Sequence, residues 1–192
     1  MEFISHVLSH IHQPSRILCD ASCSRISDAL GRAGHEVVPL AHREFAADHT
    51  FDIVLLDRTL HKVADVDAAL FGLARHLAPE GKVIVYDCAR ETMDRRTARW
   101  LYSRRAELHR EEERTLPQNA DALFLQWHEE RSHYLDGLTM ERSLLSLFDG
   151  YIHREVYCCV ELADPDGEVA ERAAINEGVI NAVGFTFVGT TE

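Results

Sequence analysis

The densest group of acid–base side chains in this sequence is Trp127-His128-Glu129-Glu130 together with His133. On a helix Glu129 and His133 share one face, whereas His128 is rotated by about 100° from Glu129. Imidazole titrates near neutral pH, so His128 and His133 are candidates for general acid–base catalysis. A solvated, charged helix face is the simpler interpretation. The spacing lacks the i, i+4 histidine pair of the zinc motif HExxH, and we therefore predict no metal site.

A second group of polar residues follows apolar runs that have the character of strands. Asp20 and Ser22 follow one such run, and Asp57 and Arg58 follow another. Ligands bind at the carboxyl ends of the strands in open parallel sheets, so these four side chains are candidates for cofactor binding. His61 stands at the entry to a predicted helix and is a third candidate for catalysis. The structural alternatives are an exposed strand-end pair for Asp57 and Arg58, and a helix cap for His61.

Arginine is concentrated in one part of the chain. The segment 90–114 holds eight arginines and six acidic residues. A solvated helix with ion pairs between residues four apart accounts for this composition. The functional alternative is a lid whose arginines bind a carboxylate or phosphate of the substrate.

The five cysteines form no disulfide framework, so we expect them to be core thiols. Cys19 and Cys23 are spaced C-x₃-C with no third cysteine nearby, which argues against an iron–sulfur site. Cys23 stands at a predicted helix N-terminus, where the pKa of a thiol is lowered. Cys158 and Cys159 point to opposite faces of a predicted strand.

The elements that position these residues alternate between strands and helices. One helix ends at Gly34, and the apolar spacing from Val63 to Leu77 predicts a second. The alternation predicts βαβ units with a parallel sheet covered on both faces. The strands are predicted at 17–21, 35–40, 51–57 and 82–88.

The pattern changes beyond these strands. Residues 90–148 are predicted to be mostly helical, and Tyr151–Leu162 is predicted to be a long strand. A turn at 165–167, a helix over 168–180 and a final strand, Gly184–Val188, follow. With a helix over 1–14 at the start and no linker or low-complexity tract, residues 1–192 are predicted to form a single domain.

The composition excludes several classes of partner. A net charge of −12 over 192 residues argues against a nucleic-acid surface and an anionic membrane surface. No signal peptide or apolar run long enough to span a bilayer is present in the sequence. We expect a cytoplasmic protein that acts on a small molecule.

Phe51–Asp87, FDIVLLDRTLHKVADVDAALFGLARHLAPEGKVIVYD, resembles a continuous part of the class I S-adenosylmethionine-dependent methyltransferases. It is similar to their fourth strand, the following helix and the fifth strand, including the Leu-x-Pro-x-Gly-type turn at Leu77–Gly81. The resemblance implies a Rossmann-like α/β sandwich with a mostly parallel seven-stranded sheet and an antiparallel C-terminal strand. It also implies a helical insertion, 90–148, after the fifth strand, and S-adenosylmethionine as the cofactor. The segments 124–133 and 180–189 resemble a bacterial subgroup that acts on small molecules.

Two departures from the family pattern concern the cofactor. The first strand–helix turn of the family carries Gly-x-Gly-x-Gly, whereas residues 20–24 contain no glycine. The family ends its second strand with an acid that binds the ribose hydroxyls, whereas Ala41 stands near that point. A Cβ fills space beside a closely bound ligand, and losing a buried bidentate acceptor costs a few kcal/mol. We therefore predict impaired or lost binding of S-adenosylmethionine. The alternative is that the family tolerates varied turns and that this member still binds the cofactor.

The sequence thus predicts a divergent methyltransferase-like protein of tailoring metabolism, which is either a pseudo-methyltransferase or a protein that uses its cleft for another reaction. If it methylates, His128 or His61 is the base that deprotonates the acceptor. One alternative is a non-catalytic partner subunit that stabilises an active paralogue, which an exposed apolar patch on the Phe3–Ile11 helix would favour. A homodimer is a further expectation. A metal-binding protein, resting only on the twelve histidines, is the weakest alternative.

Overall fold

The structure is a computed structural model that describes residues 7–11, 13–20, 24–40, 50–108 and 117–191. The chain divides into two compact units. The first unit comprises Met1–Asp87, Leu138–His153 and Thr186–Glu192, and the second comprises Cys88–Gly137 and Arg154–Phe185. The predicted single domain over 1–192 stays a prediction.

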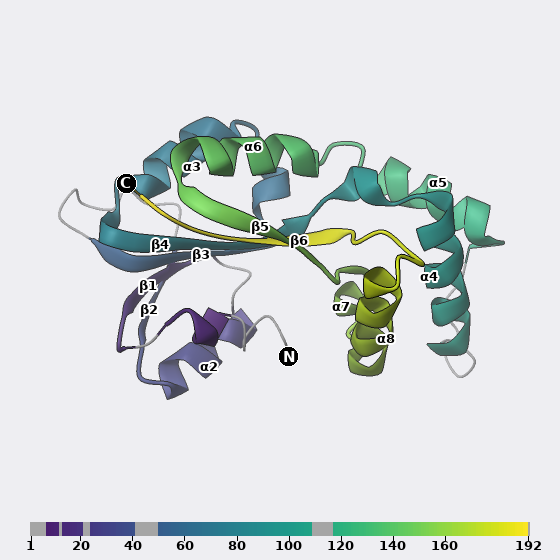
Figure 1. The fold of residues 1–192 in the computed structure, drawn as a ribbon, viewed down its shortest axis with the longest axis horizontal. Coiled ribbons are helices and arrows are strands. Elements are labelled where there is room, and N and C mark those ends of the chain that lie inside the picture. Colours follow the sequence, from purple (N-terminus) through teal and green to yellow (C-terminus); the bar gives the residue numbers. More distant parts are fainter. Residues whose placement is uncertain (1–6, 12, 21–23, 41–49, 109–116, 192) are drawn as a thin grey trace. The chain divides into compact units, whose positions relative to one another are not determined.

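Six strands within the described residues form one sheet, in the order β2-β1-β3-β4-β6-β5 (Figure 1). The resemblance predicts seven. Gly150 lies against Val188 and Gly189, and Gly184 lies against Glu155, so β5 and β6 run antiparallel. The strands are β1 (Arg16–Cys19), β2 (Glu36–Pro39), β3 (Phe51–Asp57), β4 (Leu77–Cys88), β5 (Asp149–Glu155) and β6 (Gly184–Thr190).

The parallel part of the sheet follows the predicted βαβ pattern. β1 pairs in parallel with β2 on one side and with β3 on the other, and β3 pairs in parallel with β4. In β3 only Asp52 is exposed, which fits a strand buried on both faces. The α/β prediction with a mostly parallel sheet and an antiparallel strand is confirmed.

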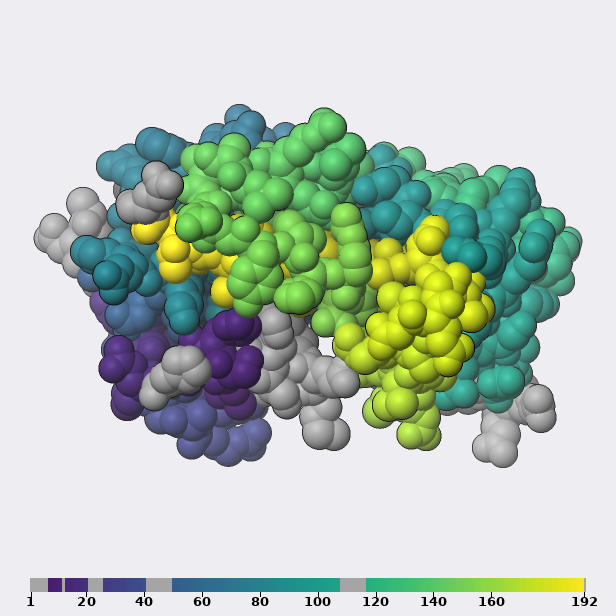
Figure 2. All heavy atoms as spheres, in the orientation of Figure 1, coloured from purple at the N-terminus to yellow at the C-terminus, as the bar shows by residue number. Residues whose placement is uncertain are grey.

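Helices cover both faces of the sheet in the first unit. α2 (Ser24–Arg32) lies on one face, and α3 (Val66–Ala74) and α6 (Gly137–Leu147) lie on the other (Figure 1). Ile26 and Leu30 of α2 pack into a core with Ile17, Ile53 and further strand residues. Gly34 adopts a φ of 91° just after α2, the left-handed conformation in which glycine commonly ends a helix. α6 is at the surface in Figure 2.

Two predicted boundaries in this unit differ from the structure. The predicted helix from Val63 to Leu77 is shorter, because Asp65 caps α3 by accepting a hydrogen bond from the amide of Ala68. Leu77 already belongs to β4. The turn expected at Leu77–Gly81 lies within β4 as an irregularity of the register: from Phe51 to Ile53 β3 advances two residues, while β4 advances five.

The second unit holds most of the predicted helical insertion. It contains η3 (Arg90–Thr92), α4 (Arg95–Leu108), α5 (Ala120–Glu130), α7 (Cys158–Glu161) and α8 (Pro165–Asn176). Pro165 occupies the first turn of α8, and the Asp164 side chain accepts the amide hydrogen of Gly167. The predicted turn at 165–167 is therefore wrong: these residues begin the helix.

The predicted long strand Tyr151–Leu162 is also wrong. β5 ends at Glu155, and Cys158–Glu161 forms the short helix α7. The carboxylate of Glu171 accepts the backbone amides of Tyr157, Cys158 and Cys159 at 2.9, 3.1 and 2.8 Å. A carboxylate at a helix N-terminus satisfies amides that have no partner within the helix, and this favours a helical turn over a strand here.

No helix in the described part of the chain is long and apolar enough to cross a membrane.

Candidate functional site

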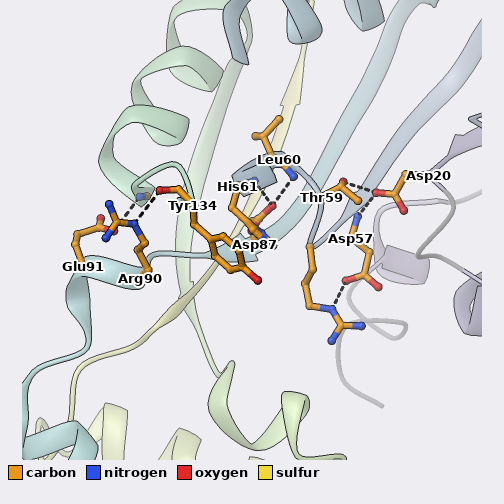
Figure 3. A network of polar contacts seen from close by, with 11 residues as sticks. Asp20, Asp57, Thr59, Leu60, His61, Asp87, Arg90, Glu91 and Tyr134 are labelled. Carbon is orange, nitrogen blue, oxygen red and sulfur yellow. Dashed lines mark hydrogen bonds and ion pairs between the residues drawn. The ribbon is translucent and has the colours of Figure 1, made fainter. Parts of the chain in front are cut away.

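Asp20 follows β1 at the carboxyl edge of the sheet, as predicted. Its carboxylate accepts the amide hydrogen of Asp57 at 2.9 Å and the hydroxyl hydrogen of Thr59 at 2.5 Å (Figure 3). Asp20 is 7% exposed. The side chain therefore ties the end of β1 to the loop that follows β3.

Asp57 and Arg58 form a pair at the end of β3. The Arg58 Nε donates to Asp57 Oδ1 at 3.1 Å. Burial raises the pKa of Asp57 above its ordinary value, against the opposing effect of the Arg58 guanidinium, and the charges of Asp20 and Asp87 raise it further. Arg58 has a φ of 55°, so the backbone turns sharply at this residue. The structural alternative of an exposed pair at the strand end is wrong for Asp57, because this residue is only 5% exposed.

His61 lies in the short helix η2 (Leu60–Lys62), beside the end of β4. Its Nδ1 is 2.5 Å from Oδ1 of Asp87, while Oδ2 of Asp87 accepts the amides of Leu60 at 2.8 Å and His61 at 3.3 Å (Figure 3). His61 and Asp87 are 2% and 0% exposed. The contacts between His61 and Asp87 hold the loop after β3 against the end of β4. Because the imidazole of His61 is buried, an acceptor molecule could reach it only if neighbouring residues moved.

The second unit holds the other two predicted catalytic histidines. His128 of α5 is half-buried against the Phe124 ring, and its Nε2 lies 3.1 Å from the carbonyl oxygen of Met93. Donation from Nε2 to that carbonyl leaves Nδ1 as the basic nitrogen. α5 ends at Glu130, so His133 lies in an exposed turn beyond the helix. The predicted helical face shared by Glu129 and His133 is therefore wrong.

Several sequence predictions fall outside the described residues. Ser22 lies there, and so do Ala41 and Cys23. The prediction of core thiols is confirmed for Cys88, Cys158 and Cys159, which are buried and free. It is wrong for Cys19, which is disulfide-bonded at the end of β1.

The strand-end rule also selects the segments Asp57–His61 and Asp87–Arg90, which contain Thr59 and Asp87, but the sequence predicts no role for these two residues. Asp87 was visible as the acid after the apolar run of β4, the signal that selected Asp20 and Asp57. Thr59 carries no such signal, because its role depends on the turn at Arg58. The described residues contain no group of three or more His, Cys, Asp or Glu side chains that could hold a metal ion.

A model of the methyltransferase domain family matches residues 18–85, which run from β1 to β4. Solved methyltransferase structures also align along nearly the whole chain. The N-methyltransferase NodS from Bradyrhizobium japonicum WM9, in complex with S-adenosylhomocysteine, aligns with a TM-score of 0.52 at 10% identity, over 99% of this chain and 86% of that chain. The fold is that of the class I methyltransferases.

Two further structures agree with this fold. The plantazolicin methyltransferase BpumL, in complex with SAH, aligns with a TM-score of 0.55 at 10% identity, over 98% of this chain and 80% of that chain. A protein from Pyrococcus horikoshii OT3 aligns with a TM-score of 0.54 at 14% identity, over 100% of this chain and 89% of that chain. The predicted family resemblance is confirmed. No curated protein sequence gives a significant match to this methyltransferase-like chain.

Proposed function

We propose that this methyltransferase-like protein acts on a small molecule and binds S-adenosylmethionine only weakly. The methyltransferase-domain match over 18–85 supports the first part of this proposal. So do the neighbours BpumL and NodS, one described as a methyltransferase of plantazolicin and the other as an N-methyltransferase. Their structures contain S-adenosylhomocysteine, the product that the cofactor leaves after methyl transfer.

The contacts of the Asp20 carboxylate support the proposal that S-adenosylmethionine binds weakly. The chain itself already binds this carboxylate, through the amide of Asp57 and the hydroxyl of Thr59. Both donors bind Oδ2, so they fix the carboxylate to the loop after β3, and the segment after Asp20 offers no glycine for close approach of the backbone. These two features support the proposal of weak cofactor binding.

Catalysis, where it occurs, rests on positioning the acceptor and on a base of the chain. We propose His128 for this base, because its Nδ1 keeps a lone pair while Nε2 faces the Met93 carbonyl. His61 is the second choice, since Asp87 orients its ring. His133 is the third.

Calorimetric titration of the protein with S-adenosylmethionine and S-adenosylhomocysteine tests the proposal. We expect a Kd of about 100 µM or weaker, because a lost buried acceptor costs a few kcal/mol and each 1.4 kcal/mol is tenfold in affinity. A low-micromolar Kd for either ligand overturns the weak-binding part. Absence of binding up to the solubility limit overturns cofactor use altogether and favours the non-catalytic partner subunit, which copurification would then identify.

The variant Asp20→Asn tests the observation behind the proposal. Its amide oxygen still accepts hydrogen bonds from the chain, whereas its charge is gone. We expect the Kd for S-adenosylmethionine to change by less than about threefold, since losing a direct charged hydrogen bond would cost tenfold or more. A loss above tenfold, with an unchanged unfolding temperature, would show that Asp20 binds the cofactor directly.

A further inference from the structure

The arginines of α4 differ sharply in how they are paired. Arg95 pairs with Asp121, Arg96 donates to the carbonyl of Gly178, and Arg104 binds Asp164 with two parallel hydrogen bonds. Arg105, in the same helix, has no hydrogen bond or ion pair with any residue that the structure describes.

Arg105 is nevertheless not a solvated surface side chain. It is half-buried, and its Nε is enclosed by protein without a hydrogen-bond partner. The two terminal nitrogens are not among the enclosed atoms that lack a partner, and no described residue pairs with them. Burial lowers the pKa of Arg105 below its ordinary value, as expected for a cation that has lost water without gaining a counter-ion.

The nearby anionic groups are already engaged. Glu161 accepts a hydrogen bond from Arg131 at 2.8 Å, and Glu130 pairs with the same guanidinium at 3.3 Å. The thiol of Cys158 carries no charge, because burial raises its pKa well above the ordinary value. Arg131 itself is a second cation close enough to repel Arg105.

Arg131 is held in place by its surroundings. Its guanidinium stacks 3.7 Å from the centroid of the Trp127 ring, and its side chain is only 11% exposed. Its Nε is also enclosed without a partner. The Nε atoms of Arg105 and Arg131 are therefore both enclosed donors without a partner among the described residues.

We infer that Arg105, with Arg131 beside it, forms an anion-binding site in the second unit for the carboxylate or phosphate group of a small metabolite. The planar fork of a guanidinium matches both groups with two parallel hydrogen bonds. An anion at this place adds to the counter-charge of Glu161 and Glu130, which Arg131 already engages. This site is independent of cofactor binding, since all the residues that form it belong to the second unit.

Thermal unfolding in sodium phosphate, sodium acetate and sodium chloride at equal ionic strength tests the site. We expect phosphate, acetate or both to raise the Tm by a few degrees over chloride in a saturable manner, because a ligand bound only to the folded state stabilises it. Which anion acts identifies the ligand class. If neither exceeds chloride, the inference is overturned.

Arg105→Gln is the decisive variant, and Arg99→Gln, at an exposed position of the same helix, is its matched control. We expect Arg105→Gln to lose the anion-dependent rise while its Tm in chloride stays equal to or above that of the wild type, since an unpaired buried charge is removed. Arg99→Gln keeps the full rise. An equal rise in Arg105→Gln contradicts the inference.

Arg105→Lys serves if Arg105→Gln does not fold. This variant keeps the positive charge but loses the planar guanidinium that donates two parallel hydrogen bonds. We therefore expect its affinity for the anion that stabilises the wild type to fall about tenfold. An affinity equal to that of the wild type overturns the assignment to Arg105.

Discussion

At the scale of single residues, buried carboxylates hold the loop after β3 in place. Asp20 fixes its first part through Thr59, and Asp87 fixes its second part through His61. Burying an ionised carboxylate is unfavourable unless hydrogen bonds replace the lost water. Here the replacements come from the loop itself, so the acids and the loop depend on each other.

Asp87→Asn should therefore destabilise the protein strongly. The carboxylate accepts from Leu60, His61 and the His61 ring, and an amide in its place turns one acceptor into a donor. We expect a loss of about 2–4 kcal/mol in urea unfolding, since partners are left unsatisfied in a buried place. Asp65→Asn, at the exposed cap of α3, should cost about 1 kcal/mol or less. Equal losses in the two variants would contradict a structural role for Asp87.

The sequence predicts which residues stand at strand ends but not how they pair. Apolar runs predict the positions of Asp20 and Asp57, and the predicted helix predicts that of His61; the structure places all three at or beside this edge. The contact between His61 and Asp87 depends on the backbone turn at Arg58, whose φ is 55°. Arginine rarely adopts that conformation, so no residue type signals the turn.

At the scale of elements, distant side chains decide where helices begin. Glu171 caps α7 from within α8, which converts an apolar run with strand character into a helix. Asp164 caps α8 and also binds Arg104 of α4. Sequence periodicity is local and does not register a cap that comes from another helix, so the boundaries at 156–167 were predicted wrongly.

The pair between Arg104 and Asp164 should give a pH-dependent contribution to stability. The Arg104 guanidinium holds the pKa of Asp164 below its ordinary value of 3.8. The pair therefore contributes fully above pH 3.8 and loses its contribution as the pH falls through the lowered value. We expect Arg104→Gln to cost about 1–2 kcal/mol at pH 7, because solvent screens a guanidinium at the surface.

Urea unfolding of both proteins at several pH values measures this effect. The difference between wild type and Arg104→Gln should shrink once Asp164 is protonated in the folded wild type. A difference that stays constant down to the lowest accessible pH would show that Arg104 acts through packing instead. Arg99→Gln should show no difference at any pH.

At the scale of the whole molecule, β5 and β6 each belong to both units. β5 passes from the first unit to the second after His153, and β6 returns from the second to the first after Phe185. Composition and βα alternation are enough to predict the α/β class. The division into two units was not predicted, because it depends on contacts between segments far apart in the chain.

Truncation after Val183 should abolish cooperative folding. It removes β6, which lies between β4 and β5, and with it the buried side chains of Phe185 and Phe187. We expect circular dichroism to show no cooperative thermal transition, since losing two buried aromatic residues alone costs several kcal/mol. Removal of 191–192 alone is the control and should leave the transition in place. A cooperative transition in the longer truncation would show that β6 is dispensable.

The strand order also determines when β5 can pair during synthesis of the chain. The ribosome makes β5 before β6, yet β6 separates β5 from the rest of the sheet. β5 therefore emerges with no native neighbour available, and its pairing waits until β6 (Gly184–Thr190) has been translated. During that interval its edge groups are open to pairing with other chains. A chaperone that shields the nascent chain would therefore help this protein more than it would help a protein whose strands pair in the order of their synthesis.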